Sequence, residues 1–436
     1  MRIARMHDGI AKRAILQALQ RGPDFSHLAS LPSTQSRPGR QLLQWLDQSG
    51  LALIFLHSVQ SCASPSPKFP TPLSPEWHEA LRERKHRNSA RFHDMLREFQ
   101  RLNDAFRARN ILAITLKGFS LSPDFCEDPL FRHQTDFDFL VAPAAVAPAA
   151  EVLKSLGYST PRLSDLQESC FTTPLTHIPS HHDDLYALQH HRQVDLHVSL
   201  VESSAWLNLD LPSDCQNHAV PMTVHNVHFV ALSLPDRFLT QVLHAFRHSS
   251  RAWLRLSWLL EIARCVELHR ENEPLWNRVV ERAGDSLLTR RAFALILSLA
   301  NRLFHSRTPC RLRSWFADAI TPSLLAWLDH FSVNWALSDW PGSLSNLLLA
   351  RDFISDSTLR WRYLTGRLLP TKAQLSIASL PSHQKKSSPA WHLHQWQYLL
   401  HRSSVHCKDL FRLPLHQLRW RRALALSHSG SCDLDS

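Results

Sequence analysis

Apolar residues recur every three to four positions between residues 92 and 106, which is the spacing of one face of an α-helix. Ser74-Pro75 stands before this stretch, and a serine followed by a proline is typical of a helix N-terminus. We therefore predict a long amphipathic helix that begins near Pro75 and turns its apolar face to the core. That face consists of Phe92, Met95, Leu96, Phe99, Leu102 and Phe106.

Two short apolar stretches follow, with a polar loop between them. Residues 111–116 predict a strand that ends at Lys117-Gly118, and residues 136–141 alternate acidic and apolar side chains. Because side chains alternate along a strand, Asp136 and Asp138 share one of its faces. Adjacent carboxylates repel each other, and Mg²⁺ prefers such hard oxygen ligands. The same spacing is also typical of an edge strand with a solvated face, so the pattern alone leaves both interpretations open.

A third alternating stretch, residues 193–200, supplies another acid. Its apolar residues fall on one face of a predicted strand, and Asp195 and His197 fall on the other. Neighbouring strands lie about 4.8 Å apart. If this strand lies next to the one that carries Asp136 and Asp138, we expect the three carboxylates to come together.

The rest of the chain favours helices. Residues 1–60 predict two or three short helices, and residues 61–74 form a connector rich in proline and serine. A capping box, Ser233-x-x-Asp236, predicts the start of a helical second half, with a polar break at 382–388 and a frayed end at 427–436. We divide the chain into an N-terminal helical segment with its connector (1–73), a core with the predicted strands (74–230) and a helical C-terminal region (231–436).

Composition narrows the functional classes. The chain has 436 residues, of which 44% are apolar, enough for two or three domains with real cores. It contains neither G-x-G-x-x-G nor G-x-x-x-x-G-K-[ST], which excludes these two glycine-rich phosphate loops. The formal charge of +11 favours an anionic partner, whether nucleotide, nucleic acid or anionic lipid.

Cysteine usage and hydropathy bear on location. The eight cysteines are scattered singly, which is typical of a reducing compartment and predicts a cytoplasmic protein. No apolar run reaches the roughly 20 residues of a membrane span, so no span is predicted. The 28 histidines include no H-E-x-x-H motif, and a zinc site is the less favoured interpretation.

The stretch from Leu116 to Val141, which contains L-K-G, an arginine and D-F-D-F-L-V, resembles the signature of the uncharacterised nucleotidyltransferase family within the polymerase-β-type nucleotidyltransferase superfamily. The resemblance extends from about Gln41 to about Phe304. It implies an α+β fold in which a small mixed-sheet nucleotidyltransferase core is flanked by N-terminal helices and a mostly helical C-terminal half. The further matching residues are Asp195-Leu196-His197, Leu243-His244-Ala245, Arg255-Leu256 and Glu261-Ile262.

This resemblance also implies an activity and its residues. The implied reaction is transfer of a nucleoside monophosphate from an NTP to a hydroxyl of an unidentified small molecule or protein, with two Mg²⁺ ions or with Mn²⁺. The implied catalytic and metal-binding residues are Asp136, Asp138 and Asp195. Lys117-Gly118-Phe119-Ser120 stands where superfamily members usually carry Gly-Ser. The implied substrate-binding residues are Lys117, Gly118, Ser120, Arg132, His197 and Arg255.

Two other functions remain open at this point. The positive charge suggests an enzyme that modifies RNA or DNA, although nucleic acid is not the favoured partner. A non-catalytic module that binds a nucleotide or a partner protein is the other. A fold-level resemblance carries the type of reaction and leaves the acceptor undetermined.

Overall fold

The computed structural model describes most of the chain in eleven ranges. The predicted break at 382–388, most of the connector at 61–74 and the last residues of the frayed end lie outside them. The described residues form an α+β fold with one six-stranded mixed sheet, as predicted. These ranges are 2–20, 23–62, 73–159, 168–172, 185–186, 192–200, 209, 211–251, 253–339, 342–368 and 389–429.

The chain divides into two compact units. The first comprises Met1–Val201, Leu211–Thr240 and Ser376–Ser382, and it contains the whole sheet. The second comprises Glu202–Asp210, Gln241–Leu375 and His383–Ser436, and its described residues are mainly helical.

The strand order across the sheet is β3-β4-β2-β1-β6-β5. β2 pairs in parallel with β4 and antiparallel with β1, which in turn pairs in parallel with β6. The strand predicted at 111–116 is shorter than expected, because only Ile114 and Thr115 pair with both neighbours. The strands are β1 (Ile114–Thr115), β2 (Asp136–Leu140), β3 (Glu168–Thr172), β4 (Gln193–His197), β5 (Val220–Val224) and β6 (Val227–Ala231).

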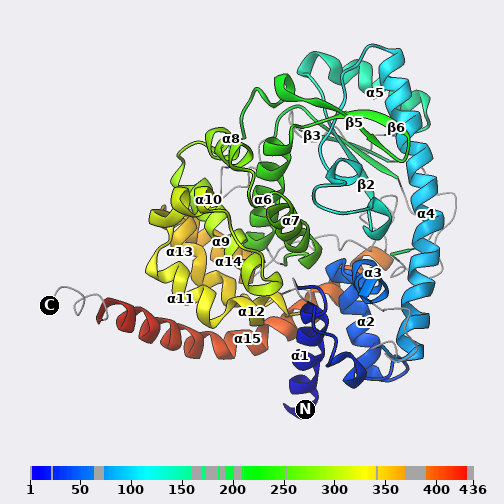
Figure 1. Ribbon diagram of the computed structural model, residues 1–436. Coiled ribbons are helices and arrows are strands. Elements are labelled where there is room, and N and C mark those ends of the chain that lie inside the picture. Colours follow the sequence, from blue (N-terminus) through cyan, green and yellow to red (C-terminus); the bar gives the residue numbers. More distant parts are fainter. Residues whose placement is uncertain are drawn as a thin grey trace. The chain divides into compact units, whose positions relative to one another are not determined.

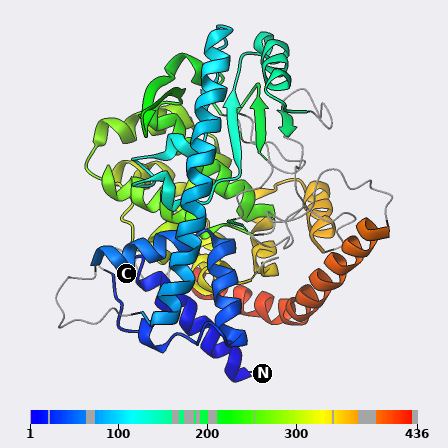
Figure 2. The ribbon, with the colours of Figure 1, turned by 90° about the vertical axis from the view of Figure 1, so that its right-hand side faces the viewer.

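The long helix α4 (Pro75–Ala108) packs on one face of the sheet (Figures 1 and 2). Its predicted apolar stripe lies in one core cluster with strand residues Phe137, Phe139, Val194 and Leu196. The helix starts where predicted, with Ser74 at the N-cap and Pro75 at the first helical position. The Ser74 hydroxyl makes no capping hydrogen bond.

Alternation along β2 fixes the direction of the acids. Phe137 and Phe139 are 2% and 0% exposed and enter the core beneath α4. Asp136 and Asp138 therefore project from the opposite face of the same strand. The burial of two phenylalanines thus positions the two carboxylates.

The first unit contains further helices. The N-terminal residues form three helices, and Gly50 separates the second from the third in a left-handed conformation (φ 73°). The predicted capping box opens α6, with the Ser233 hydroxyl donating to Asp236 Oδ2 at 2.8 Å. These elements are α1 (Arg2–Gln17), α2 (Arg37–Ser49), α3 (Ala52–Cys62), α5 (Val146–Ser155), α6 (Leu234–Arg251, which continues into the second unit), and the short 3₁₀ helices η1 (Leu28–Ser30), η2 (Gly118–Leu121), η3 (Pro129–Phe131) and η4 (Pro143–Ala145).

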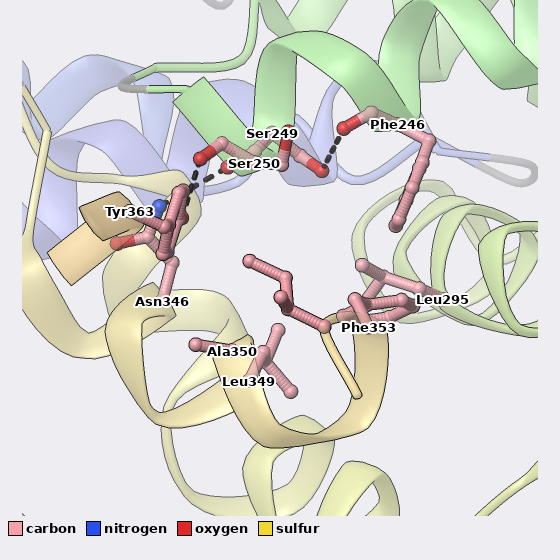
Figure 3. A pocket seen from close by; sticks show the side chains of 10 residues that line it. Phe246, Ser249, Ser250, Leu295, Asn346, Leu349, Ala350, Phe353 and Tyr363 are labelled. Atoms are coloured by element: carbon pink, nitrogen blue, oxygen red, sulfur yellow. Dashed lines mark hydrogen bonds between the residues drawn. The ribbon is translucent and has the colours of Figure 1, made fainter. Parts of the chain in front are cut away.

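A cavity of about 340 Å³, including its open mouth, lies within the second unit (Figure 3). Phe246, Leu349 and Phe353 give it an apolar lining, and Tyr363 donates from its hydroxyl to the carbonyl oxygen of Ser250 at 2.5 Å. The helices of this unit are α7 (Leu256–Leu268), α8 (Glu273–Ala283), α9 (Leu287–Phe304), α10 (Cys310–Phe316), α11 (Pro322–His330), α12 (Ser332–Ala336), α13 (Ala350–Phe353), α14 (Ser357–Leu368) and α15 (Pro389–Ser429), with the 3₁₀ helix η7 (Leu344–Leu349).

Within the described ranges, no helix combines the length and the apolar character that crossing a bilayer requires. The last helix, α15, is anchored to the second unit by buried polar side chains. Arg402 donates from Nη2 to the carbonyl oxygen of Arg367 at 2.9 Å and from Nε to Nε2 of His406 at 3.2 Å. Burial, followed by the charges of Arg402 and Arg367, lowers the pKa of His406 to about 4, and Asp409 opposes the shift. His406 is therefore neutral at neutral pH and can accept the hydrogen bond.

We expect acid to weaken this anchoring. The pKa of His406 is about 4 in the folded chain, below the ordinary value of 6.5. Between these values the unfolded chain binds a proton that the folded chain excludes, so stability falls as the pH decreases from 6.5 toward 4. His406→Gln keeps a hydrogen-bond acceptor without the titration. It should remove about 1–2 kcal/mol of this loss, after allowance for solvent screening. Thermal unfolding of both proteins at neutral pH and at pH ~5 measures how much stability each of them loses in acid. An identical acid dependence in both proteins would contradict the role of His406.

Candidate active site

The three predicted acids lie on two adjacent strands in the middle of the sheet. In the parallel pairing of β2 with β4, Asp138 lies opposite Asp195, and Asp136 lies opposite Gln193. Residues opposite each other on neighbouring strands project from the same face of a sheet. Asp138 and Asp195 are 7% and 5% exposed, and Asp136 is half-buried. The chain therefore gathers three buried or half-buried acidic residues on one sheet face.

The Asp138 carboxylate lies between two basic side chains. Its Oδ1 is 3.1 Å from Nε2 of His197, at the end of β4, and 3.6 Å from Nζ of Lys117. The acid is nearly fully buried, so these partners offset the cost of removing its charge from water. Lys117 and His197, which the sequence analysis named for substrate binding, are thus both in contact with Asp138.

Asp195 has a partner that the sequence analysis missed. The side-chain amide of Gln193 donates from Nε2 to both carboxylate oxygens of Asp195, at 3.0 and 2.8 Å. These hydrogen bonds fix the orientation of the carboxylate. The alternation along the strand carried the signal, because a residue two positions before Asp195 must share its face.

Asp136 lies in an electrostatically unfavourable position. Burial raises its pKa above the usual range, and the charge of Asp138 raises it further. The positive charges of Lys117 and Arg132 oppose this shift. Arg132, which the resemblance implies as a substrate-binding residue, thus acts through its charge on Asp136.

The loop after β1 holds Lys117 through close packing at Gly118. Gly118 has a φ of 66°, and a Cβ added to it would lie 2.3 Å from Nε2 of Gln134. That Gln134 amide donates to the carbonyl oxygen of Asp136 at 2.9 Å. Gly118 therefore lets a side chain from the polar loop reach the start of β2. The sequence analysis did not foresee this reason for a glycine at position 118, which is its close packing against Gln134.

Ser120 lies inside the protein. It is 0% exposed, and its hydroxyl donates to the carbonyl oxygen of Lys117 at 3.3 Å. Its own carbonyl oxygen accepts a hydrogen bond from Nη1 of Arg237 at 2.5 Å, and Arg237 also pairs with Asp124 at 3.2 Å. In this arrangement Ser120 supports the Lys117 loop and does not present its hydroxyl to a substrate, in contrast to the expectation from sequence.

Arg255 belongs to the second unit. It stands at the N-cap position of α7 and is 9% exposed. The nearby rings of His244, His248 and Trp258 contact one another, with centroids 4.5 to 4.7 Å apart. Arg255, which the resemblance implies as a substrate-binding residue, thus lies in the second unit at the start of α7.

The chemistry of the acids fits a hard divalent cation. Three carboxylates supply the oxygen ligands that Mg²⁺ prefers, and a cation would relieve the repulsion that raises the pKa of Asp136. In the part of the chain that the structure describes, however, no group of three or more histidine, cysteine or acidic side chains has the arrangement needed to bind a metal ion. Two of the acids contact other side chains: Asp138 contacts Lys117 and His197, and Asp195 accepts hydrogen bonds from Gln193. A cation that binds Oδ1 of Asp138 or the Asp195 carboxylate therefore shares these oxygens with protein groups.

The fold and the site together identify an α+β protein that carries three acidic residues on one face of two adjacent central strands. The sequence model of a family described as uncharacterised nucleotidyltransferase matches residues 36–305, more than half of the chain. The chain belongs to this family, as its sequence predicted. Neither the curated proteins nor the solved structures gave a match. The membership supports the nucleotidyltransferase class of enzyme and an NTP as substrate.

Proposed function

We propose that this protein is a Mg²⁺-dependent nucleotidyltransferase that moves a nucleoside monophosphate from an NTP to a hydroxyl group of a small molecule or a protein. The observation that carries the proposal is the register of β2 with β4, in which Asp138 lies opposite Asp195 and Asp136 shares their face. Membership of a nucleotidyltransferase family supports the NTP. If these strands had only a structural role, three acids at these positions would add no stability, because their charges repel one another.

The proposed roles follow from the contacts. Asp136, Asp138 and Asp195 are the residues that would hold Mg²⁺ or Mn²⁺. When bound, the ion supplies positive charge that neutralises the triphosphate and polarises the reacting phosphate. Lys117, whose Nζ lies 3.6 Å from Asp138, neutralises phosphate charge together with Arg132.

The reaction that we propose is an in-line displacement. The acceptor hydroxyl oxygen forms a bond to the α-phosphorus, and the bond from that phosphorus to the oxygen bridging to the β-phosphate breaks. Pyrophosphate leaves, and the hydroxyl proton passes to Asp195. Gln193 holds the Asp195 carboxylate through both of its oxygens, and His197 orients Asp138.

A second candidate is a module that binds a nucleotide without turning it over. One observation favours it: protein donors occupy Oδ1 of Asp138 and both oxygens of Asp195. If these hydrogen bonds persist when the nucleotide is bound, fewer lone pairs of Asp138 and Asp195 are left to bind a cation.

Labelled nucleotides distinguish the two candidates. We expect label from the α-phosphate of an NTP to be transferred to a component of cell extract only in the presence of Mg²⁺, and label from the γ-phosphate to appear in pyrophosphate. Transfer of the γ-label to the acceptor would mean phosphoryl transfer and would contradict the proposal. NTP binding with no transfer across all four nucleotides would support the second candidate. Loss of the labelled product after nuclease treatment would identify RNA or DNA as the acceptor.

We also propose a cytoplasmic location. The six cysteines from Cys126 to Cys407, whose side chains the structure describes, are free thiols, which is typical of a reducing compartment.

A further inference from the structure

The last helix of the second unit is α15, drawn in orange to red in Figure 1. It exposes a row of large apolar side chains. Successive members are separated by three, four or eleven residues, each close to a whole number of helical turns, so they share one face. The row extends for about 38 Å at 1.5 Å per residue. We call this set the free face of α15. It consists of Leu393 (60% exposed), Trp396 (64%), Leu400 (64%), Phe411 (84%), Leu415 (59%) and Leu418 (47%).

The free face is not the side by which α15 packs on its own unit. Arg402, His406 and Trp420 are 4%, 4% and 7% exposed, and they lie on the opposite side of the helix. They join α15 to its neighbours through Arg367 and through Ser323, whose carbonyl oxygen accepts from Trp420 Nε1 at 3.4 Å. The helix therefore packs by a face that includes arginine and histidine, and it leaves the four leucines, the tryptophan and the phenylalanine of the free face uncovered. Ser404 and Cys407 divide the row into two apolar groups, Leu393–Leu400 and Phe411–Leu418. Exposed apolar groups of this kind normally mark an interaction surface.

The charges beside the free face are almost all positive. α15 contains six lysine and arginine residues and a single acidic residue, Asp409. That acid is half-buried and accepts a hydrogen bond from the backbone N–H of Leu344 at 3.0 Å. The exposed arginines cluster at the C-terminal end of the row, at Arg412, Arg419, Arg421 and Arg422.

We propose that the free face of α15 binds the surface of an anionic lipid bilayer. Leucine and aromatic side chains enter the boundary between head groups and acyl chains, and the arginines beside them contact lipid phosphates and carboxylates. The charge pattern selects this occupant over a second copy of the chain, because two such helices face to face would bring like charges together. It also fits the convex shape of a helix face, which a bilayer accepts without a groove.

This surface is independent of the proposed transfer reaction. α15 lies outside residues 36–305, which the family model covers, and none of its residues belongs to the candidate active site. Loss of membrane binding would leave nucleotide transfer to a water-soluble acceptor intact, so the two proposals can fail separately.

Sedimentation of the full-length protein with vesicles tests the proposal. We expect the protein to bind vesicles of phosphatidylcholine mixed with phosphatidylserine, to bind vesicles of pure phosphatidylcholine much more weakly, and to be released from the mixed vesicles by salt. Leu415→Ser should weaken binding to the mixed vesicles about tenfold, and the combination with Phe411→Ser should weaken it further. Replacing Arg421 and Arg422 together with glutamine should also weaken binding by about tenfold or more.

Leu268→Ser is the matched control. Leu268 is 58% exposed, almost the same as Leu415 at 59%, but lies at the end of α7. We expect this variant to bind the mixed vesicles as the unchanged protein does. Failure of the unchanged protein to bind, or equal binding by the Leu415→Ser protein, would overturn the proposal. A dimer in solution that Leu415→Ser dissociates would also overturn it, since the free face would then bind a second copy of the chain.

Discussion

Asp138→Asn is expected to lower Mg²⁺-dependent pyrophosphate release about a thousandfold or more. Asp138 is the acid that contacts both Lys117 and His197, and it lies opposite Asp195 across the β2–β4 pair. Asparagine has nearly the same shape, so the strand and its core face should be preserved. It lacks the negative charge that we propose to be needed for the cation, and one of its two terminal atoms becomes a donor.

The measurement is the rate of pyrophosphate release from each NTP in the presence of cell extract, with circular dichroism as the check on folding. Asp104→Asn is a suitable control, because Asp104 is an exposed acid on α4 that pairs only at the surface with Arg107, at 3.0 Å. That variant should retain full activity. If the Asp138→Asn protein folds and releases pyrophosphate at the unchanged rate, Asp138 has no role in the reaction.

Phe99→Ala should have the largest effect on stability, about 3–5 kcal/mol. Phe99 is 1% exposed on α4, and its ring lies 4.6 Å from that of Phe119 and 5.0 Å from that of Phe229, between centroids. The rings of Phe137 and Phe139 on β2 stack at 6.0 and 6.1 Å. Truncation to alanine leaves a cavity where the helix meets both the acid-bearing strand and the loop after Lys117.

Equilibrium unfolding in urea measures this change, and pyrophosphate release at low temperature shows whether looser packing under β2 also disturbs the acids. The matched control is Phe411→Ala, since Phe411 is 84% exposed on α15. It should change the free energy of unfolding by no more than about 0.5 kcal/mol. A loss below about 1 kcal/mol for Phe99→Ala would mean that the aromatic cluster is not the centre of this core.

The sequence determined several local features of this protein. The helical period from Phe92 to Phe106 predicted a long helix and its buried face, and the structure confirms both. Alternation along residues 136–141 predicted that the phenylalanines and the acids occupy opposite faces of a strand. The capping box at Ser233 predicted the start of α6. Each of these depends on residues within one or a few turns of one another, so local periodicity is sufficient to reveal it.

Family membership was also readable from the sequence. The motif from Leu116 to Val141 and the Asp195-Leu196-His197 stretch indicated the family that matches residues 36–305. What they left open was geometric: whether β4 lies beside β2, and which residues face each other.

Only the tertiary structure decided the pairing and the contacts that follow from it. His197 and Asp138 lie 59 residues apart in the chain, yet the parallel register brings them within 3.1 Å. The structure also identified Gln193 as the hydrogen-bond donor to Asp195 and showed that Ser120 is buried. It showed in addition which face of α15 packs on its unit and which face is exposed. Side-chain periodicity sets the face on which a residue lies. The partner across that face depends on contacts between distant segments, and these form only when the chain has folded.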